Sequence, residues 1–174
     1  MTSDPFDPGV NPFADPPHTR DPVRRFRGRL VAPVTIATAG IGRYKAGLTV
    51  SSLMVVEGEP GLVYLLVGAT TDFYTQLSDT RRFVVHICTA TQQELADVFA
   101  GLKPSPGGIF AGRATSDSDY GTILDDIDTR AYCSLLDTSE ESYSVLVSAA
   151  IDRVDAEDLL DPLSYYRGKY GRLS

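Results

Sequence analysis

The chain has 174 residues, of which 43% are hydrophobic, and a formal net charge of −7. This length predicts one domain with its own core, and the acidic balance argues against a general nucleic-acid binder, because phosphate contact needs a basic surface. The sequence has no 18-residue apolar run and no signal-peptide pattern, so it favours a soluble cytoplasmic protein without a membrane span.

Residues 1–18 are rich in Pro and Asp and have little to bury, which predicts a flexible or extended arm before a domain at 19–174. An arginine-rich segment follows at 20–29. Asp21 can cap a short helix there, with Pro22 at its first position. A solvated helix is the ordinary interpretation of such a charge run, and a role near a phosphate is the alternative.

Strand patterns come next in the chain. Enrichment in β-branched residues predicts a strand at 31–40. Strict alternation predicts a second strand at 47–56, and an apolar run predicts a buried strand at 62–67. The short turn segments between these strands predict a β-meander.

Helical signals then alternate with a further strand. Residues 72–79 predict a helix with Thr71 as N-cap, and 81–90 predict a strand. Thr91 and Glu94 have the spacing of a capping box, which predicts a second helix beginning there.

The last third of the chain reads as a loop followed by strands. Residues 102–130 are rich in Gly, Pro, Ser and Asp and predict a long loop. Strands are expected around 131–137 and 142–154. Several strands with only two or three short helices predict a mainly β fold, a β-barrel with a few helices.

The sequence has no conventional catalytic set. The two histidines are His18 and His86, and His86 lies in a predicted strand, where a packed or hydrogen-bonded role is expected. Cys88 and Cys133 have no CxxC spacing, so buried thiols are expected, without a disulfide framework or zinc site. A Walker loop, a nucleophile elbow and clustered metal ligands are missing. If the protein is an enzyme, a cofactor is expected to carry the reaction.

Two stretches could contact a ligand. Thr49, Ser51 and Ser52 interrupt a strand of Leu, Met and Val, where their hydroxyls could orient a flat heterocycle or belong to an ordinary exposed strand face. Residues 68–71 connect a buried strand to a helix N-terminus, where free amides and the helix dipole favour an anion. Simple N-capping by Thr71 is the alternative.

Four stretches together resemble a known family. They are VAPVTIATAG at 31–40, AGLTVSSLMVV at 46–56, RRFVVHICTATQQELADVFAG at 81–101 and PLSYYRGKYGRL at 162–173. In this order they are similar to strands, a helix and the terminal segment of the flavin reductase-like family, whose members bind FMN or FAD on a split β-barrel. The resemblance extends over about residues 30–174.

The resemblance implies a homodimeric, FMN-binding split barrel of the six-stranded Greek-key type. It implies an NAD(P)H:flavin oxidoreductase that uses FMN or, alternatively, FAD, with NADH or NADPH as hydride donor. Reduced flavin would then diffuse to a partner monooxygenase or another acceptor. The alternatives are a non-catalytic flavin- or haem-binding barrel that has lost the nicotinamide site, and a relative that oxidises a small substrate with bound FMN.

The resemblance also implies the residues of a flavin site, while the flavin itself carries the reaction and no catalytic side chain or metal ligand is assigned. The cofactor-binding residues so implied are Thr49, Val50, Ser51, Ser52, Leu53, Gly68, Ala69, Thr70, Thr71, Arg167 and Tyr170. The aromatic and basic terminal segment would lie near the flavin and the dimer interface. A basic tail docked on the protein's own acidic surface is the alternative for that segment.

Three positions depart from the family pattern. Asp72 stands where the family commonly has an arginine in its phosphate-binding turn. Residues 141–143 read Glu-Ser-Tyr where many reductases have Gly-Asp-His, whose histidine helps to form the nicotinamide site. The arginine segment at 20–29 replaces the family's usual lead-in to the first strand.

Overall fold

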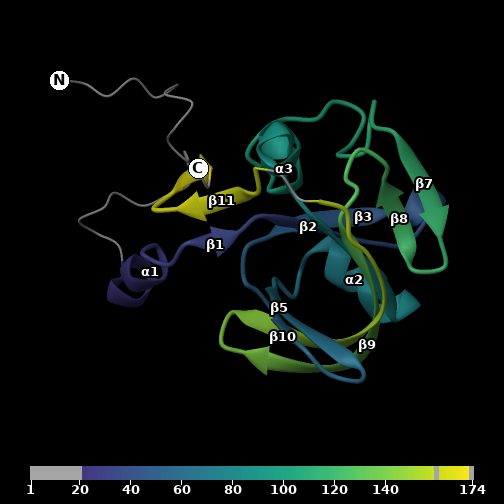
Figure 1. Cartoon of the computed structure of the whole chain (residues 1–174), viewed down its shortest axis with the longest axis horizontal. Coiled ribbons are helices and arrows are strands. Elements are labelled where there is room, and N and C mark those ends of the chain that lie inside the picture. Colours follow the sequence, from purple (N-terminus) through teal and green to yellow (C-terminus); the bar gives the residue numbers. More distant parts are fainter. Residues whose placement is uncertain (1–20, 159–160, 173–174) are drawn as a thin grey trace.

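A computed structural model of the chain describes residues 21–158 and 161–172. The arm expected at 1–18, with His18, therefore lies outside the described residues. Within the described part, the strands form sheets of seven, three and two strands, with short helices between them (Figure 1). None of the described helices has the length and apolar character needed to cross a membrane.

The seven-stranded sheet is antiparallel throughout, in the order β3-β2-β6-β9-β10-β5-β4, and it curls into a half-barrel (Figure 1). The mainly β split-barrel prediction is confirmed, although the sheet has seven strands and not six. Its strands are β2 (Thr35–Ala39), β3 (Ala46–Val50), β4 (Leu53–Val56), β5 (Gly61–Val67), β6 (Arg82–Ile87), β9 (Arg130–Glu141) and β10 (Ser144–Asp155).

The prediction of one continuous strand at 47–56 is wrong. The chain leaves β3 at Val50 and enters β4 at Leu53, on the opposite edge of the sheet. The alternation of apolar residues continues on both sides of Ser51 and Ser52, so the sequence pattern does not reveal the break. The split at this crossing accounts for the additional strand.

The core lies inside the curl of the half-barrel. Inward side chains such as Val63 and Val147 are buried, and Phe73 and Leu77 of α2 (Asp72–Thr80) pack against them. The ring of Phe73 meets that of Phe83 edge-on, with 6.0 Å between centroids. The helix predicted at 72–79 is therefore confirmed and closes part of the core.

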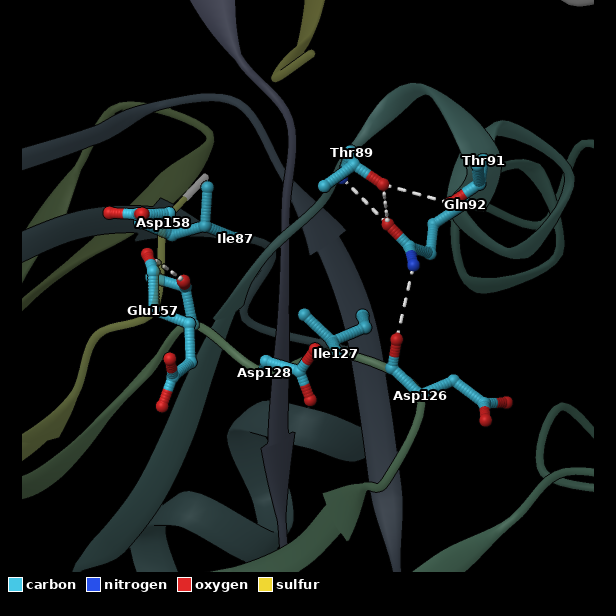
Figure 2. A pocket seen from close by; sticks show the side chains of 10 residues that line it. Ile87, Thr89, Thr91, Gln92, Asp126, Ile127, Asp128, Glu157 and Asp158 are labelled. Atoms are coloured by element: carbon cyan, nitrogen blue, oxygen red, sulfur yellow. Dashed lines mark hydrogen bonds between the residues drawn. The ribbon is translucent and has the colours of Figure 1, made fainter. Parts of the chain in front are cut away.

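The second helix, α3 (Gln93–Phe99), begins differently from the prediction. The capping box joins Thr89 and Gln92, and the Thr89 amide donates to Gln92 Oε1 at 2.7 Å (Figure 2). A box of Thr91 and Glu94 is wrong, because the Glu94 carboxylate instead pairs with a lysine beyond the helix. The chain therefore turns two residues earlier, in a 3₁₀ turn that precedes α3.

The prediction of an unstructured loop at 102–130 is also wrong, because this segment contains the hairpin of β7 (Thr115–Ser118) and β8 (Gly121–Leu124). Strand β7 reads TSDS and has little strand propensity of its own. Tertiary contacts hold the hairpin instead. The amide and hydroxyl of Thr122 both donate to Gly40 O, at 2.9 and 3.1 Å.

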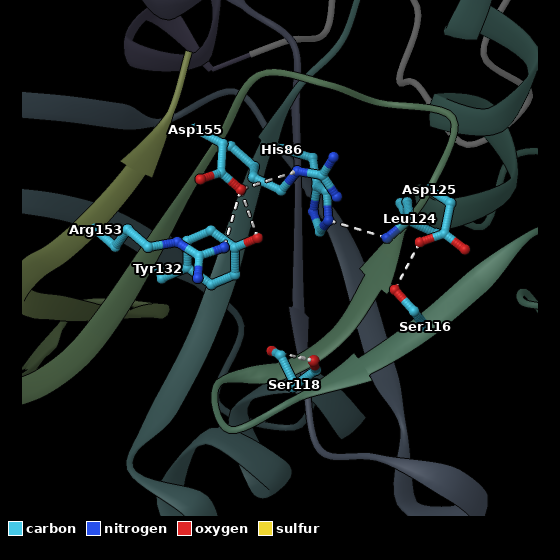
Figure 3. A network of polar contacts seen from close by, with 10 residues as sticks. His86, Ser116, Ser118, Leu124, Asp125, Tyr132, Arg153 and Asp155 are labelled. Atoms are coloured by element: carbon cyan, nitrogen blue, oxygen red, sulfur yellow. Dashed lines mark hydrogen bonds and ion pairs between the residues drawn. The ribbon is translucent and has the colours of Figure 1, made fainter.

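His86 fastens the same hairpin to the main sheet from a fully buried position. Its Nδ1 donates to Ile36 O at 3.1 Å. Its Nε2 accepts from the Leu124 amide, also at 3.1 Å (Figure 3). This confirms the expected hydrogen-bonded histidine. Burial lowers the pKa of the imidazole to about 4, so the ring is neutral at ordinary pH.

A separate three-stranded sheet joins the first strand of the described chain to its last two strands. It consists of β1 (Ala32–Pro33), β11 (Leu163–Tyr166) and β12 (Lys169–Arg172), in the order β1-β11-β12. The helix expected near the N-terminus is confirmed as α1 (Pro22–Arg27), with the Asp21 carboxylate accepting from the Val23 amide at 2.9 Å.

We predict an acid-sensitive stability that arises from His86. In the unfolded chain the imidazole takes up a proton below about pH 6.5, whereas the folded imidazole does so only near pH 4. The free energy of unfolding should therefore fall by about 3 kcal/mol as pH drops through this window, since each unit of difference in pKa corresponds to about 1.4 kcal/mol.

Urea unfolding between pH 7 and pH 4 measures this dependence. His86→Gln removes the titrating group, so the variant should be less stable at pH 7 but should lose less stability on acidification. If the free energy of unfolding falls equally with pH in the wild type and in His86→Gln, His86 is not the source of the acid sensitivity.

Candidate functional site

The two ligand-contacting stretches inferred from the sequence meet in space. The Leu66 amide of β5 donates to Ser52 O at 3.2 Å, and the Ser52 hydroxyl donates back to Leu66 O at 3.4 Å. Strand β5 ends at Val67, and residues 68–71 follow directly. The crossing from β3 to β4 therefore lies beside the turn that leads into α2.

Thr71 shapes that turn and starts α2. Its hydroxyl donates to Gly68 O at 2.8 Å and accepts from the Tyr74 amide at 3.2 Å. The N-cap prediction is confirmed, and the hydroxyl of Thr71 is thereby occupied within the protein. Ala69 and Thr70 are exposed at the tip of the turn, so their backbone and side chains are the accessible groups at the N-terminus of α2.

The remaining residues of the first stretch have different surroundings. The Thr49 hydroxyl donates to Ala96 O of α3 at 2.7 Å, which fastens the helix to β3. Val50 is buried in the core, and Leu53 is half-buried against it. The partly exposed Ser51 hydroxyl has no hydrogen-bond partner among the described residues, which leaves it available to a ligand.

Arg167 and Tyr170 lie on the β11–β12 hairpin. The turn places Arg167 and Gly168 at positive φ, 52° and 84°, as in a two-residue hairpin loop. The Arg167 amide donates to Gly28 O at 3.0 Å, which ties the turn to the segment after α1. The Tyr170 hydroxyl donates to Asp97 Oδ1 of α3 at 2.9 Å, and burial together with this bond raises the pKa of the phenol.

A cavity of about 480 Å³ opens beside this hairpin, a volume within the usual range for small-molecule sites. It is lined by Tyr166, Arg167, Lys169, Tyr170 and Gly171. The sequence analysis did not assign Tyr166 and Lys169 to the site. In the structure these two residues form the strand pair next to the hairpin turn. A hairpin predicted around Arg167 and Gly168 would have placed them together.

These residues form two groups within one chain. No hydrogen bond between described residues joins 49–53 or 68–71 to the hairpin, although Thr49 and Tyr170 contact α3 at the adjacent residues Ala96 and Asp97. The first group offers hydroxyls and turn amides, which suit the polar edge of a flat heterocycle. The hairpin group offers aromatic rings and two cations, which suit an anionic aromatic ligand.

A second cavity, of about 230 Å³, has the opposite character (Figure 2). It lies between the start of α3 and the loops at 126–129 and 157–158, and four of its lining residues are carboxylates. Such a lining repels phosphate. No group of three or more potential ligands in the described ranges is arranged to hold a metal ion.

The buried reactive groups of the described chain are not poised for catalysis. Both nitrogens of His86 are hydrogen-bonded inside the protein, so this ring is not placed to ligate haem. Cys88 and Cys133 are free and buried as expected, and burial raises the pKa of each thiol to about 12. None of these three groups is therefore placed to take part directly in a reaction.

Two of the three departures from the family pattern, Asp72 and residues 141–143, lie around the first group of residues. Asp72 is an exposed residue in the first turn of α2. Tyr143, at the β9–β10 turn, is 98% exposed. The register pairs Val145 with Val67, so this turn lies at the same end of β5 as residues 68–71.

Comparisons with known proteins agree with this geometry. A family model described as the flavin reductase like domain matches residues 27–174. A "4-nitrophenol 4-monooxygenase/4-nitrocatechol 2-monooxygenase, reductase component" of Rhodococcus opacus is 26% identical over 150 residues, 85% of this chain and 78% of its own length. An "NADH-dependent FMN reductase" of Streptomyces nodosus subsp. asukaensis is 28% identical over 167 residues, 88% of this chain and 85% of its own.

Solved structures share the fold of this chain. An NADH:FAD oxidoreductase of Streptomyces globisporus superposes with a TM-score of 0.79 at 20% identity, covering 92% of this chain and 97% of its own. Nitrilotriacetate monooxygenase component B from Mycobacterium thermoresistibile superposes with a TM-score of 0.78 at 25% identity, covering 87% and 85%. With the family model matching from Arg27 to the last residue, this chain belongs to the flavin reductase-like domain family.

Proposed function

We propose that this protein is an NADH-dependent flavin reductase that uses FMN, with FAD as the alternative flavin and NADPH as the alternative donor. The observation that carries the proposal is the pairing of Ser52 with Leu66, which places the crossing beside the end of β5, directly before the turn at 68–71 and the N-terminus of α2. The relatives named above support the reaction class, because one is described as an NADH-dependent FMN reductase and one as a monooxygenase reductase component.

In this proposal the protein positions the flavin, and the flavin accepts a hydride from the nicotinamide when both are bound. Ser51, Ser52 and the turn at 68–71 hold the heterocycle. Arg167 and Tyr170 contribute a cation and an aromatic face. The flanking residues support the flavin site indirectly, through their backbone groups and by holding the β3–β4 crossing in place. These residues are Thr49, Val50 and Leu53.

Anaerobic turnover tests the proposal directly. Purified protein is mixed with NADH or NADPH and with FMN, FAD or riboflavin, and the loss of nicotinamide absorbance is followed. Catalysed oxidation that depends on added flavin supports a reductase. A protein that binds flavin and leaves NADH unchanged would instead fit the alternative of a non-catalytic flavin carrier, which the replacement of Gly-Asp-His by 141–143 favours.

We further propose that reduced flavin leaves the protein and serves a partner monooxygenase. The description of the Rhodococcus opacus relative as a monooxygenase reductase component supports this. A homodimer is also proposed, because the sheet leaves apolar residues of β4 exposed, and such patches mark interfaces. The free thiols Cys88 and Cys133 suit a reducing, cytoplasmic compartment.

Alanine at Ser51 or Ser52 should weaken FMN binding. A neutral hydrogen bond contributes about 0.5–1.5 kcal/mol, which corresponds to roughly 2- to 10-fold in affinity. Thr49→Val is the matched control. The Thr49 hydroxyl donates to Ala96 O, so removing it should lower the stability of the protein with little effect on its affinity for FMN. Fluorescence titration with FMN measures all three variants. If both serine variants bind FMN as tightly as the wild type, the β3–β4 crossing is not part of the flavin site.

Asp72→Arg should tighten FMN binding by about fivefold and leave riboflavin unchanged, because only FMN carries the phosphate. Asp79→Arg makes the same charge change in the last turn of α2 and serves as the control. Calorimetry measures the affinity of each variant for FMN and for riboflavin. Low salt is used because dissolved ions screen the attraction between the arginine and the phosphate. If Asp72→Arg changes both affinities equally or neither, the phosphate does not lie at residues 70–72.

A further inference from the structure

Asp97 occupies a position in α3 that local preferences do not explain. It lies in the last turn of the helix, where a carboxylate opposes the helix dipole. Aspartate is also among the weaker helix formers. Lys103, which follows the helix, forms its ion pair with Glu94 at 3.7 Å. A residue that departs from local preference often serves a functional or tertiary contact, so the partner of Asp97 is informative.

The partner of Asp97 is the Tyr170 hydroxyl of the terminal hairpin, which donates to Asp97 Oδ1 at 2.9 Å. The bond is partly buried, and a hydrogen bond to a charged acceptor is stronger than one between neutral groups. Burial, followed by this bond and the charge of Asp97, raises the pKa of the phenol, so Tyr170 keeps its proton at ordinary pH. The phenol uses that proton on Asp97 and therefore has none to donate to a ligand.

The Tyr170 ring is held at a second point. It meets the ring of Tyr165, its partner in the strand register, edge-on with 5.4 Å between centroids. The ring contact and the bond at the hydroxyl together fix the place and the tilt of the Tyr170 ring. The same side chain lines the hairpin cavity of about 480 Å³. What Tyr170 offers to a ligand in that cavity is therefore an aromatic surface of fixed orientation.

Helix α3 connects this anchoring to the first group of site residues. The carbonyl of Ala96, one residue before Asp97, accepts from the Thr49 hydroxyl of β3 at 2.7 Å. The Asp97 carbonyl accepts from the Leu102 amide at 2.9 Å, which fixes the backbone that carries the carboxylate. Adjacent residues of one helix thus hold both the strand that leads into the β3–β4 crossing and the terminal hairpin.

We propose that Asp97 is a positioning residue of the flavin site: its carboxylate holds the Tyr170 ring in the orientation that packs on the flavin. The role rests on the proposed function, because the ring is positioned for a flavin. Asp97 itself does not touch the ligand and acts through Tyr170. The sequence pattern gives no sign of this role, because 73 residues separate the pair.

Fluorescence titration with FMN measures the contribution of each partner. Asp97→Ala and Tyr170→Phe both remove the bond, and each should weaken FMN binding by about 2- to 10-fold, the contribution of a well-placed aromatic contact. Tyr170→Ala, which removes the ring itself, should weaken binding further. Asp97→Asn keeps a carbonyl oxygen as acceptor and should recover most of the affinity lost in Asp97→Ala. Glu94→Ala is the control, because it removes the other carboxylate of α3 and should leave the affinity unchanged.

A double-mutant cycle separates positioning from a general loss of stability. If Asp97 acts through Tyr170, Asp97→Ala should cost no further affinity in a protein that already carries Tyr170→Phe. Losses of affinity that multiply instead would overturn the positioning role. Urea unfolding of the same variants reports the stability of the fold. Lower stability with unchanged FMN affinity would mean that the bond only fastens the hairpin.

The wild-type titration separates the positioning role from the proposed function. A wild type that binds neither FMN, FAD nor riboflavin contradicts the proposed function and the positioning role with it. If the wild type binds FMN and both Asp97→Ala and Tyr170→Phe bind it equally well, the proposed function stands and the positioning role is wrong. An Asp97→Asn variant that binds as weakly as Asp97→Ala also overturns positioning by this hydrogen bond.

Discussion

Between Val50 and Leu53 the chain passes from one edge of the seven-stranded sheet to the other in two residues. This crossing forces the sheet to curl, because β3 and β4 must come close enough to be joined by Ser51 and Ser52 alone. The inward faces of β5 and β10 then enclose a single core. The crossing also places the two serines against the end of β5, so the curvature of the barrel and the position of the candidate site have the same cause.

Side-chain hydrogen bonds hold the helices and hairpins in place around this crossing. The Thr49 hydroxyl holds α3 against β3, and Asp97 on the same helix holds Tyr170 of the terminal hairpin. His86 and Thr122 fasten the β7–β8 hairpin to β2 from the other side. These bonds are buried or partly buried, where an unpaired polar group would cost about 1–3 kcal/mol, so each one specifies a single arrangement.

The charges of this acidic chain are distributed unevenly, and that distribution relates the fold to its proposed functions. Cationic side chains gather on α1 and on the β11–β12 hairpin, which the bond from the Arg167 amide to Gly28 O brings together. Carboxylates line the smaller cavity and the turns at 57–59 and 140–141. The proposed flavin site on the hairpin therefore offers positive charge to an anionic flavin.

Much of the fold could be predicted from the sequence because local signals were strong. The strand at 62–67, the helix capped by Thr71, the helix at Pro22 and the buried roles of His86, Cys88 and Cys133 follow from residue pattern and chemistry alone. The sequence also determined which stretches could contact a ligand, because hydroxyls in an apolar strand and a glycine before a helix depend on residue type.

Tertiary structure decided what local pattern could not distinguish. The alternation at 47–56 is the same for one strand as for two, so only the curled sheet revealed the crossing. The weak β7 sequence forms a strand because Thr122 and His86 dock its partner. The capping box forms at Thr89 and Gln92 of the 3₁₀ turn before α3, and not at Thr91 and Glu94. Likewise, the meeting of the serines with residues 68–71 and the pairing of Tyr170 with Asp97 connect positions far apart in the chain, which only packing brings together.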